Sequence, residues 1–217
     1  MRKILVYLQY PKYMFAKSLY KRSETVSIEG VAIKKLIDED MERYTPNKMK
    51  EFSKSFVLTY LLLNNSVFRT QFYFRISQDR RFADSISLYL SKKFLKPLEN
   101  VQIGINKTGF VDGGLFIVHS SGCVLSTHRA GKNLTIFQGV TTGDSGKLNQ
   151  EGYKNPVFGD NVTVFANAVV AGGITVGNNV TIGAGSVVLR DVPDNCCVVG
   201  NPARIIKKDG KKVDIKL

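Results

Sequence analysis

The 217-residue sequence is poor in the residue types that build disulfide frameworks, metal centres and membrane spans. Its three cysteines, Cys123, Cys196 and Cys197, are an odd number and cannot form a fully paired framework. Two histidines are too few for a three-histidine zinc site, so we expect no metal. The longest apolar stretch, Phe56 to Leu63, is far shorter than the roughly 18 residues that a membrane-spanning helix needs.

Acidic residues are scarce relative to basic ones, with 18 Asp and Glu against 31 Lys and Arg and a net charge of +13. The excess is uneven, because residues 1–99 hold 19 basic and 10 acidic side chains. It could favour an anionic lipid surface, a charged polysaccharide precursor or the phosphates of a nucleotide-containing cofactor, but a solvated basic face is the commonest explanation of such a count. No nucleic-acid-binding module is recognisable, so we expect no nucleic-acid partner. Since no leader of secretory type opens the chain, we expect a cytoplasmic location. Within the cytoplasm, the protein could lie at the inner face of the membrane.

The dominant feature that is present is a six-residue repeat running without a break from Phe158 to Pro193. Each cell starts with an apolar residue, usually follows it with Gly or Ala, and has a small or β-branched residue at its fifth position. One strand of this length cannot bury its apolar face alone, so identical cells stack and share a core. The pattern continues upstream from Val111 to Thr141 with one register slip, at Arg129. The repeat therefore predicts a β-solenoid.

The rest of the chain divides around this solenoid. We expect an α-helical region over 1–99, the solenoid over 100–208 with a protruding polar loop at 142–157, and a basic tail at 209–217. Apolar stripes at helical spacing predict helices over 27–44, over 47–63, after Ser66, and from Asp84 to Phe94. The helical region is interpreted as a cap on the solenoid; its aromatic and basic residues would alternatively hold the protein at a membrane surface.

Four segments carry a more specific signal: Gly113–His119, Gln138–Gly143, the Gly159-Asp-Asn and Gly177-Asn-Asn repeats, and Asp191–Asp194 followed by Gly200–Ile205. Together they resemble the catalytic domain of the hexapeptide-repeat O-acetyltransferases, in the serine acetyltransferase-like branch associated with polysaccharide biosynthesis. The resemblance implies a mainly β fold, a left-handed parallel β-helix with an N-terminal α-helical region. It also implies acetyl-CoA as co-substrate, a homotrimer, and active sites in the clefts between neighbouring subunits.

His119 is the candidate catalytic residue. Moving an acetyl group from a thioester to an alcohol needs a base, a donor for the developing oxyanion and two substrates held in line. The cell that begins at Ile117 places His119 outside the coil, and the resemblance implies the role of general base. An exposed histidine without a function is the alternative, and we interpret His128 as a turn or surface residue. The ring of His119 would be oriented by a backbone carbonyl or by one of three carboxylates, those of Asp112, Asp144 and Glu151.

The resemblance also implies the cofactor site. It places the pantetheine arm of coenzyme A against three small residues, Gly143, Ala166 and Ala184. The nucleotide phosphates would rest near four basic residues, Arg190, Arg204, Lys207 and Lys208. Turn geometry and a solvated basic end of the solenoid are the alternative explanations for these two sets.

Departures from the family bear on the acceptor. Val118 stands where the serine enzymes carry an acidic residue, and Gly104 stands where they carry the acid that orients the histidine. Lys154 and Asn155 replace an Arg-His pair that resembles a clamp for the serine carboxylate, and Lys lacks the bidentate fork of Arg. We therefore expect a sugar or surface-polysaccharide hydroxyl as acceptor, bound by Lys154, Asn155 and Asp112. Serine O-acetylation for cysteine biosynthesis is the alternative, and a non-catalytic solenoid that binds or scaffolds is a further one.

Overall fold

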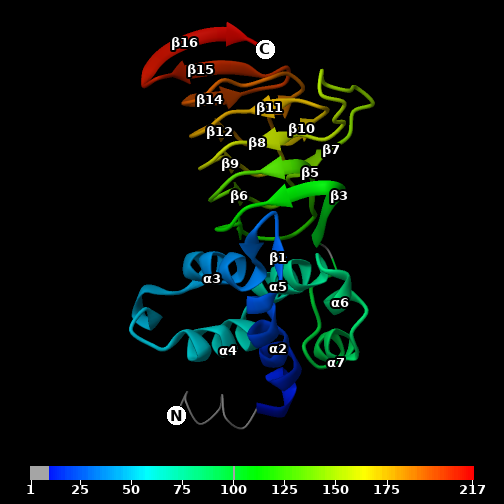
Figure 1. The fold of residues 1–217 in the computed structure, drawn as a ribbon. Coiled ribbons are helices and arrows are strands. Elements are labelled where there is room, and N and C mark those ends of the chain that lie inside the picture. Colours follow the sequence, from blue (N-terminus) through cyan, green and yellow to red (C-terminus); the bar gives the residue numbers. More distant parts are fainter. Residues whose placement is uncertain (1–9, 100) are drawn as a thin grey trace. The chain divides into compact units, whose positions relative to one another are not determined.

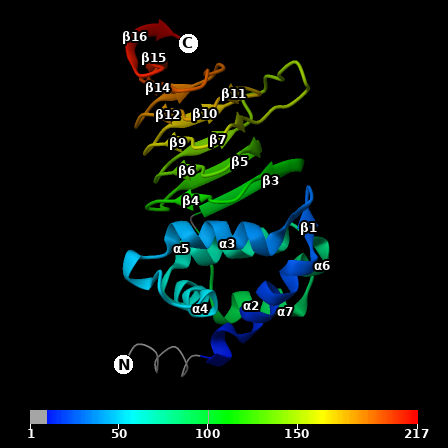
Figure 2. The ribbon, with the colours of Figure 1, turned by 60° about the vertical axis from the view of Figure 1, so that its left-hand side comes forward.

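The computed structural model describes residues 10–99 and 101–217, and the side chains of residues 13–99, 101–103 and 109–217. The chain forms two compact units, Met1–Glu99 and Asn100–Leu217 (Figures 1 and 2). Over the described residues, no helix has both the length and the apolar composition that crossing a bilayer requires.

The first unit is a group of α-helices with one short β-hairpin. Its elements are α2 (Tyr10–Arg22), β1 (Ser27–Ile28), β2 (Val31–Ala32), α3 (Ile33–Tyr44), α4 (Lys54–Asn64), α5 (Ser66–Ser77), α6 (Arg80–Ala83) and α7 (Ile86–Phe94). Two 3₁₀ turns, Ser23–Thr25 and Asn47–Met49, join some of them. The buried faces of these helices meet in one core that includes Leu19, Ile33, Leu61 and Phe72, all at most 1% exposed.

Two of the predicted helices begin later than the sequence suggests. The helix predicted over 27–44 begins at Ile33, because Glu29 and Gly30 have φ of +48° and +80° and close a β1–β2 hairpin instead. The helix predicted over 47–63 begins at Lys54, because the Ser53 hydroxyl caps it by accepting from the Phe56 amide.

The second unit is a left-handed parallel β-helix of about five turns with three faces, which confirms the predicted fold class. Face 1 consists of β4 (Phe116–Ile117), β6 (Thr135–Ile136), β9 (Thr163–Val164), β12 (Thr181–Ile182) and β14 (Cys196–Val199). Face 2 consists of β7 (Thr141–Gly143), β10 (Val169–Ala171) and β13 (Val187–Val188), with the first parts of β3 (Val101–Val111) and β5 (Cys123–Ala130). Face 3 consists of the last parts of β3 and β5 with β8 (Val157–Phe158) and β11 (Thr175–Val176).

The apolar residue that starts each cell lies inside the coil. Strand register on face 1 stacks Ile117, Ile136, Val164, Ile182 and Val198 in one column, and each is at most 2% exposed. Since the strands are parallel and in register, like residues lie above like in successive coils.

Asparagines form the corner between faces 3 and 1, here the third corner. Asn133, Asn161, Asn179 and Asn195 have φ between +55° and +59°, a conformation that Asn tolerates better than most residues. Their side chains form a ladder, in which each amide Nδ2 donates to the Oδ1 of the next coil at 3.0–3.2 Å. The ladder therefore provides hydrogen-bond partners for the Asn side chains that the repeat places at the turn.

The register slip predicted at Arg129 is the sum of two separate changes in the number of residues that form a corner. At the first corner, between faces 1 and 2, six residues (118–123) separate Ile117 from Val124, where the next coil has four (137–140). At the second corner, between faces 2 and 3, three residues (126–128) separate Leu125 from Arg129, where a later coil has four (171–174). The sequence shows only the net gain of one residue, so placing a single slip at Arg129 is wrong.

The solenoid ends in an antiparallel hairpin where the sequence analysis expects a basic tail. Strands β15 (Arg204–Lys208) and β16 (Lys211–Lys216) pair with each other, and β15 pairs with β14. Asp209 and Gly210 form the turn with φ of +48° and +78°. An Asp-Gly pair between two strands is a strong hairpin signal.

Candidate functional site

His119 lies on the enlarged first corner of the solenoid. Its side chain is exposed and its backbone has a φ of +49°. The amide of Gly139 donates to the carbonyl of Ser121 at 2.8 Å, so Ser121 occupies the regular stacking position of this corner. His119 and Ser120 are therefore the two additional residues, and they carry the imidazole out of the regular turn.

The first corner continues along the solenoid and reaches two small residues in its later coils. The stacking position of Ser121 is occupied by Gln138 in the next coil and by Ala166 and Ala184 in the two coils after that. The hydrogen bonds from the Asn167 amide to the Gln138 carbonyl and from the Gly185 amide to the Ala166 carbonyl show this register. Beside these residues, the rings of Phe137 and Phe165 stack with centroids 4.8 Å apart. The first corner thus combines an exposed imidazole with low side chains in its later coils and an aromatic wall.

The polar loop projects from the second corner. It leaves the solenoid after Gly143 and returns at Val157, in the yellow-green segment that extends beyond the strands in Figure 1. Asn155 is 6% exposed, and its amide donates to the Ser126 hydroxyl at 2.9 Å and to the Ser126 carbonyl at 3.3 Å. Asn155 thus anchors the loop to β5, whereas the neighbouring Lys154 is exposed.

His128 holds the same end of the loop. It lies at the second corner, as the interpretation of a turn residue expects, but it is largely buried, so interpreting it as a surface residue is wrong. It lies within β5, is 9% exposed, and its ring stacks on the ring of Tyr153 with centroids 3.5 Å apart. Its amide also donates to the carbonyl of Pro156 at 2.9 Å. The stack joins residues 25 positions apart, a relationship that no local sequence pattern reveals.

A glycine lets the loop lie directly on the next coil. A Cβ at Gly173 would overlap the carbonyl oxygen of Tyr153 and lie 2.6 Å from the amide nitrogen of Asn149. The Gly173 amide donates to the carbonyl of Lys147 at 3.2 Å, and the Asn149 amide to the carbonyl of Tyr153 at 2.9 Å. The loop is therefore packed against the solenoid by its backbone.

A hollow of about 710 Å³, here the loop hollow, lies between this loop, the turn at Gly172–Ile174 and the end of β16. Lys147, Arg190 and Lys216 line it with positive charge, Asp191 adds one carboxylate, and Leu148 and Leu189 line it with exposed apolar surface. Of these, sequence reasoning identified only Arg190. Gly143 stacks below Ala171 and Leu189 on the adjoining edge of face 2, and the space where its Cβ would lie is open.

The other predicted residues lie elsewhere. Arg204 donates to Asp214 across the β15–β16 hairpin, with Nε 2.6 Å from Oδ1. In the same hairpin, Lys207 is exposed and stands opposite Lys212. Asp112 lies on the third corner, where its carboxylate accepts from the Gly113 amide at 2.7 Å.

The carboxylates proposed to orient the histidine do not meet it within one chain. Asp112 is separated from His119 by the face 1 strand β4, and Asp144 and Glu151 belong to the loop on the second corner. Gly104 lies on β3, outside the residues whose side chains are described. Among the described residues, no group of three or more His, Cys, Asp and Glu side chains is placed to hold a metal ion.

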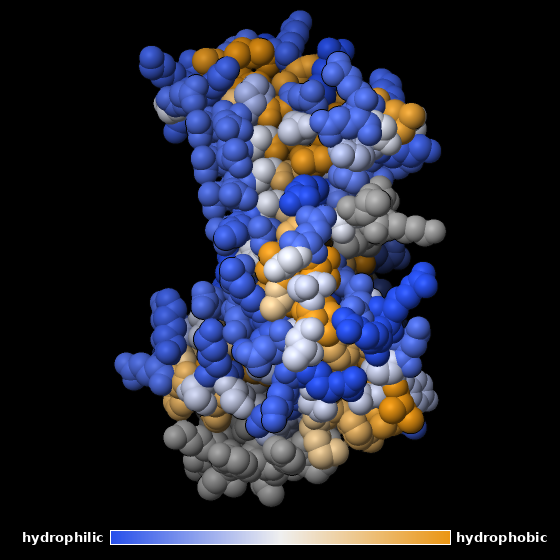
Figure 3. Space-filling model, viewed as in Figure 1, coloured by the Kyte–Doolittle hydropathy of each residue, from blue (hydrophilic) through white to orange (hydrophobic). Residues whose placement is uncertain are grey.

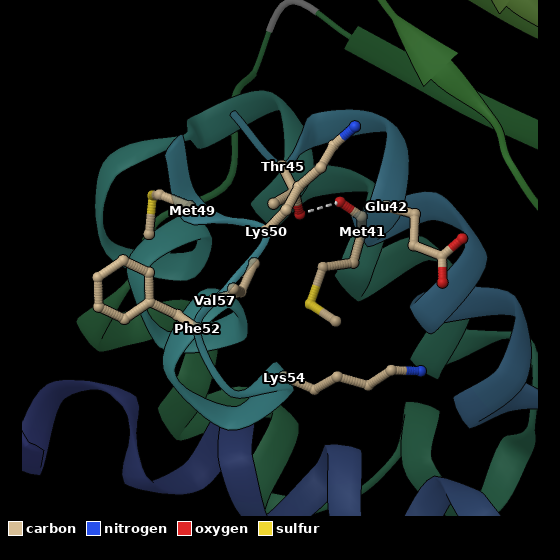
Figure 4. Close-up of a pocket in the computed structure, with 8 residues that line it drawn as sticks. All are labelled: Met41, Glu42, Thr45, Met49, Lys50, Phe52, Lys54 and Val57. Carbon is tan, nitrogen blue, oxygen red and sulfur yellow. Dashed lines mark hydrogen bonds between the residues drawn. The ribbon is translucent and has the colours of Figure 1, made fainter. Parts of the chain in front are cut away.

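The helical unit holds a second hollow, of about 350 Å³ (Figure 4). Its wall is largely apolar, with Met41, Met49 and Val57 each at most 6% exposed. Lys54, on its edge, pairs with Asp38 at 3.2 Å. Its lining residues include no histidine, and no cysteine that could act as a nucleophile.

Comparisons with known proteins identify the repeat. Residues 155–190 match the family described as bacterial transferase hexapeptide (six repeats). A serine acetyltransferase of Synechococcus elongatus is 51% identical over 102 residues, which cover 46% of this chain and 41% of the relative. One of Staphylococcus aureus strain N315 is 41% identical over 138 residues, covering 64% of this chain and 56% of the relative. The chain spans about half the length of these curated relatives.

A solved structure shows the same fold over most of the chain. It is that of Neisseria gonorrhoeae serine acetyltransferase in complex with serine, with a TM-score of 0.60 and 28% sequence identity. The match covers 86% of this chain and 73% of that one.

Proposed function

We propose that this chain, whose solenoid matches the hexapeptide transferases and whose homologues include serine acetyltransferases, transfers an acetyl group from acetyl-CoA to the hydroxyl of L-serine. The observation that carries the proposal is the exposed His119 on a two-residue enlargement of the first corner, a corner that continues through Gln138 to the small residues Ala166 and Ala184. The comparisons favour serine over the sugar acceptor that the sequence departures suggest.

The geometry supports a trimer with shared sites. His119 and the two small residues lie on the first corner, whereas the loop and the loop hollow lie on the second corner of the same chain. A ring of three copies, in which the first corner of each meets the second corner of the next, would bring these two halves together. Each of three equivalent clefts would then contain one imidazole and one loop, from different chains.

Such a cleft fits acetyl-CoA. The loop hollow offers three cationic side chains, Lys147, Arg190 and Lys216, for the nucleotide phosphates. The open space at Gly143 and the low side chains of Ala166 and Ala184 would let the pantetheine arm run toward His119. Arg204, already paired with Asp214, is a weaker candidate than the sequence suggests.

The proposed reaction is direct acyl transfer. The unprotonated imidazole of His119 removes the proton of the serine hydroxyl as the oxygen attacks the thioester carbonyl. The tetrahedral intermediate collapses with loss of the coenzyme A sulfur, which takes the proton from the imidazolium. The products are O-acetylserine and coenzyme A, and His119 returns to its starting state.

Lys154 is the candidate contact for the serine carboxylate. Tyr153 and Asn155, on either side of it, are both held against β5, so its backbone is fixed while its ammonium group stays exposed. A single ammonium supplies charge without the geometric selectivity of a guanidinium. Because Lys154 stands where the serine enzymes carry Arg, a sugar hydroxyl remains the second candidate acceptor.

The test is release of free thiol from acetyl-CoA with L-serine, compared with a panel of nucleotide sugars and oligosaccharides. Turnover with L-serine and none with the sugars supports the proposal, and the reverse result establishes the second candidate. His119→Ala should lower turnover by about 100-fold or more, the usual contribution of a general base. Unchanged turnover in that variant would remove His119 from the mechanism.

A further inference from the structure

Helices α2 and α7 of the first unit expose several large apolar side chains. Ile86 is 74% exposed, Tyr89 64% and Phe94 50%, all on α7, and Met14 on α2 is 44% exposed. The two helices pack together, and the rings of Phe15 and Phe94 stack with centroids 6.0 Å apart. Figure 3 shows apolar side chains gathered over the α7 region. Clustered exposed apolar residues of this kind mark contact surfaces more often than single ones do.

The same two helices carry only positive charge. Their 13 and 9 residues include no Asp or Glu, and their basic residues are Lys12, Lys17, Lys21, Arg22, Lys92 and Lys93. Four of these, Lys21, Arg22, Lys92 and Lys93, are exposed. The basic residues therefore flank the apolar ones on one pair of neighbouring helices.

The spacing on α7 places both kinds of residue on one helical face. Ile86, Tyr89 and Lys93 are separated by three and four positions, the spacing of neighbours along one side of a helix. Tyr has an apolar ring and a polar tip, which suits the boundary between lipid tails and headgroups. Lys can extend its ammonium group to headgroup phosphates while its methylene chain stays in an apolar environment.

We propose that the exposed surface of α2 and α7, defined by Met14, Ile86, Tyr89, Phe94 and the four exposed basic residues, binds an anionic lipid bilayer peripherally. The aliphatic and aromatic side chains enter the headgroup region, and the lysines and arginine contact lipid phosphates. Membrane association of this kind is separate from the acyl-transfer site, which lies in the solenoid unit.

The charge of the α2–α7 surface favours a bilayer over a second copy of the chain as its binding partner. Two copies joined through α2 and α7 would bring together two surfaces that each carry at least four exposed positive charges on these helices and no helical carboxylate. Like charges placed against each other are unfavourable. An anionic bilayer instead offers the opposite charge together with an apolar interior.

The experiment is co-sedimentation of the full chain with vesicles of phosphatidylcholine alone or mixed with phosphatidylglycerol. We expect binding only to the mixed vesicles. Lys92→Glu with Lys93→Glu should weaken it by about 30-fold, because each lysine near such a surface contributes about fivefold in affinity. The matched control, Lys211→Glu with Lys212→Glu in the β15–β16 hairpin, makes the same charge change in the other unit and should cost less than about threefold.

A second set of variants tests the contribution of the apolar side chains to vesicle binding. Ile86→Ser with Tyr89→Ser should weaken binding by about tenfold or more, since buried apolar area is lost. Ile215→Ser, at a residue 44% exposed on β16, is the matched control. All these side chains are exposed, and circular dichroism would verify that each variant folds.

A fluorescence measurement tests insertion directly, because the chain contains no tryptophan. Tyr89→Trp places a single indole at the proposed contact, and its emission should shift to shorter wavelength when anionic vesicles are added. Ile215→Trp should show no shift.

Three results would overturn the proposal. They are absence of binding to either vesicle, equal loss in the hairpin and α7 charge variants, and a change of oligomeric state in Ile86→Ser with Tyr89→Ser that identifies a second copy as the occupant. None of these measurements uses turnover, so their failure is distinct from failure of the proposed acetyl transfer.

Discussion

The imidazole of His128 lies nearly parallel to the phenol ring of Tyr153, with 3.5 Å between ring centroids and 18° between ring planes. His128 belongs to β5 and Tyr153 to the projecting loop, so the contact joins the loop to the solenoid. Together with the bond from Asn155 to Ser126, it holds the backbone on both sides of Lys154. The stack thus positions a residue that we propose contacts the acceptor.

Replacing Tyr153 with Leu should release the loop. We expect faster amide hydrogen exchange over residues 144–154 and a higher KM for L-serine with a smaller change in kcat, because Lys154 would no longer be held in place. Tyr153→Phe keeps the ring stack and is the matched control, which should resemble the wild type. Normal exchange in the Leu variant would show that the stack does not hold the loop.

The helical unit contains a buried ion pair between α3 and α5. Arg75 and Asp40 have side chains 0% and 2% exposed, joined by bonds of 2.8 Å (Nε to Oδ2) and 2.9 Å (Nη2 to Oδ1). Arg75→Met should lower the free energy of unfolding by about 3–5 kcal/mol, because it leaves a buried carboxylate without its partner. Asp40→Leu combined with Arg75→Met should recover part of that loss in urea denaturation. Strictly additive losses would contradict the coupling.

Tyr73 gives the stability of the helical unit a dependence on alkaline pH. Burial raises the pKa of Tyr73 to about 12, and its hydroxyl donates to the carbonyl of Leu95 at 2.9 Å. Since the folded state holds this proton more tightly than the unfolded state, the stabilisation is complete below about pH 10 and is lost as the pH rises toward 12. The loss amounts to about 2–3 kcal/mol.

Urea denaturation at a series of pH values measures this loss. Tyr73→Phe should have a shallower pH dependence, although Tyr20, whose pKa is also raised by burial and by Asp38, would still titrate at high pH. An unchanged slope in Tyr73→Phe would show that this phenol does not carry the effect.

The solenoid could be predicted because its information is periodic. Residues such as Ile136 and Val164 lie inside the coil as the repeat indicates. Single residues that favour a corner, such as Asn161 with its positive φ, are also visible in the sequence. The hairpin after Lys208 was also predictable, because Asp209-Gly210 between two short extended segments is a hairpin turn signal.

The enlarged and shortened corners could not be predicted from the repeat. The first corner adds residues and the second removes one, so the sequence reveals only the net gain in residue number. It does not show that each of these two corners carries one of the two histidines. The stack of His128 on Tyr153 depends on how a loop folds back onto β5, and stacking geometry leaves no mark on composition or spacing.

The central claim is that one active site combines His119 of one chain with the loop of its neighbour, and subunit complementation tests it most directly. One inactive partner is His119→Ala, and the other has residues 145–153 replaced by a short Gly-Ser linker. Each should be inactive alone in the thiol-release assay with L-serine. Random mixed trimers should regain about one quarter of wild-type turnover, because that fraction of clefts receives both intact halves. Mixed trimers that stay inactive, while each variant still assembles, would contradict a site shared between chains.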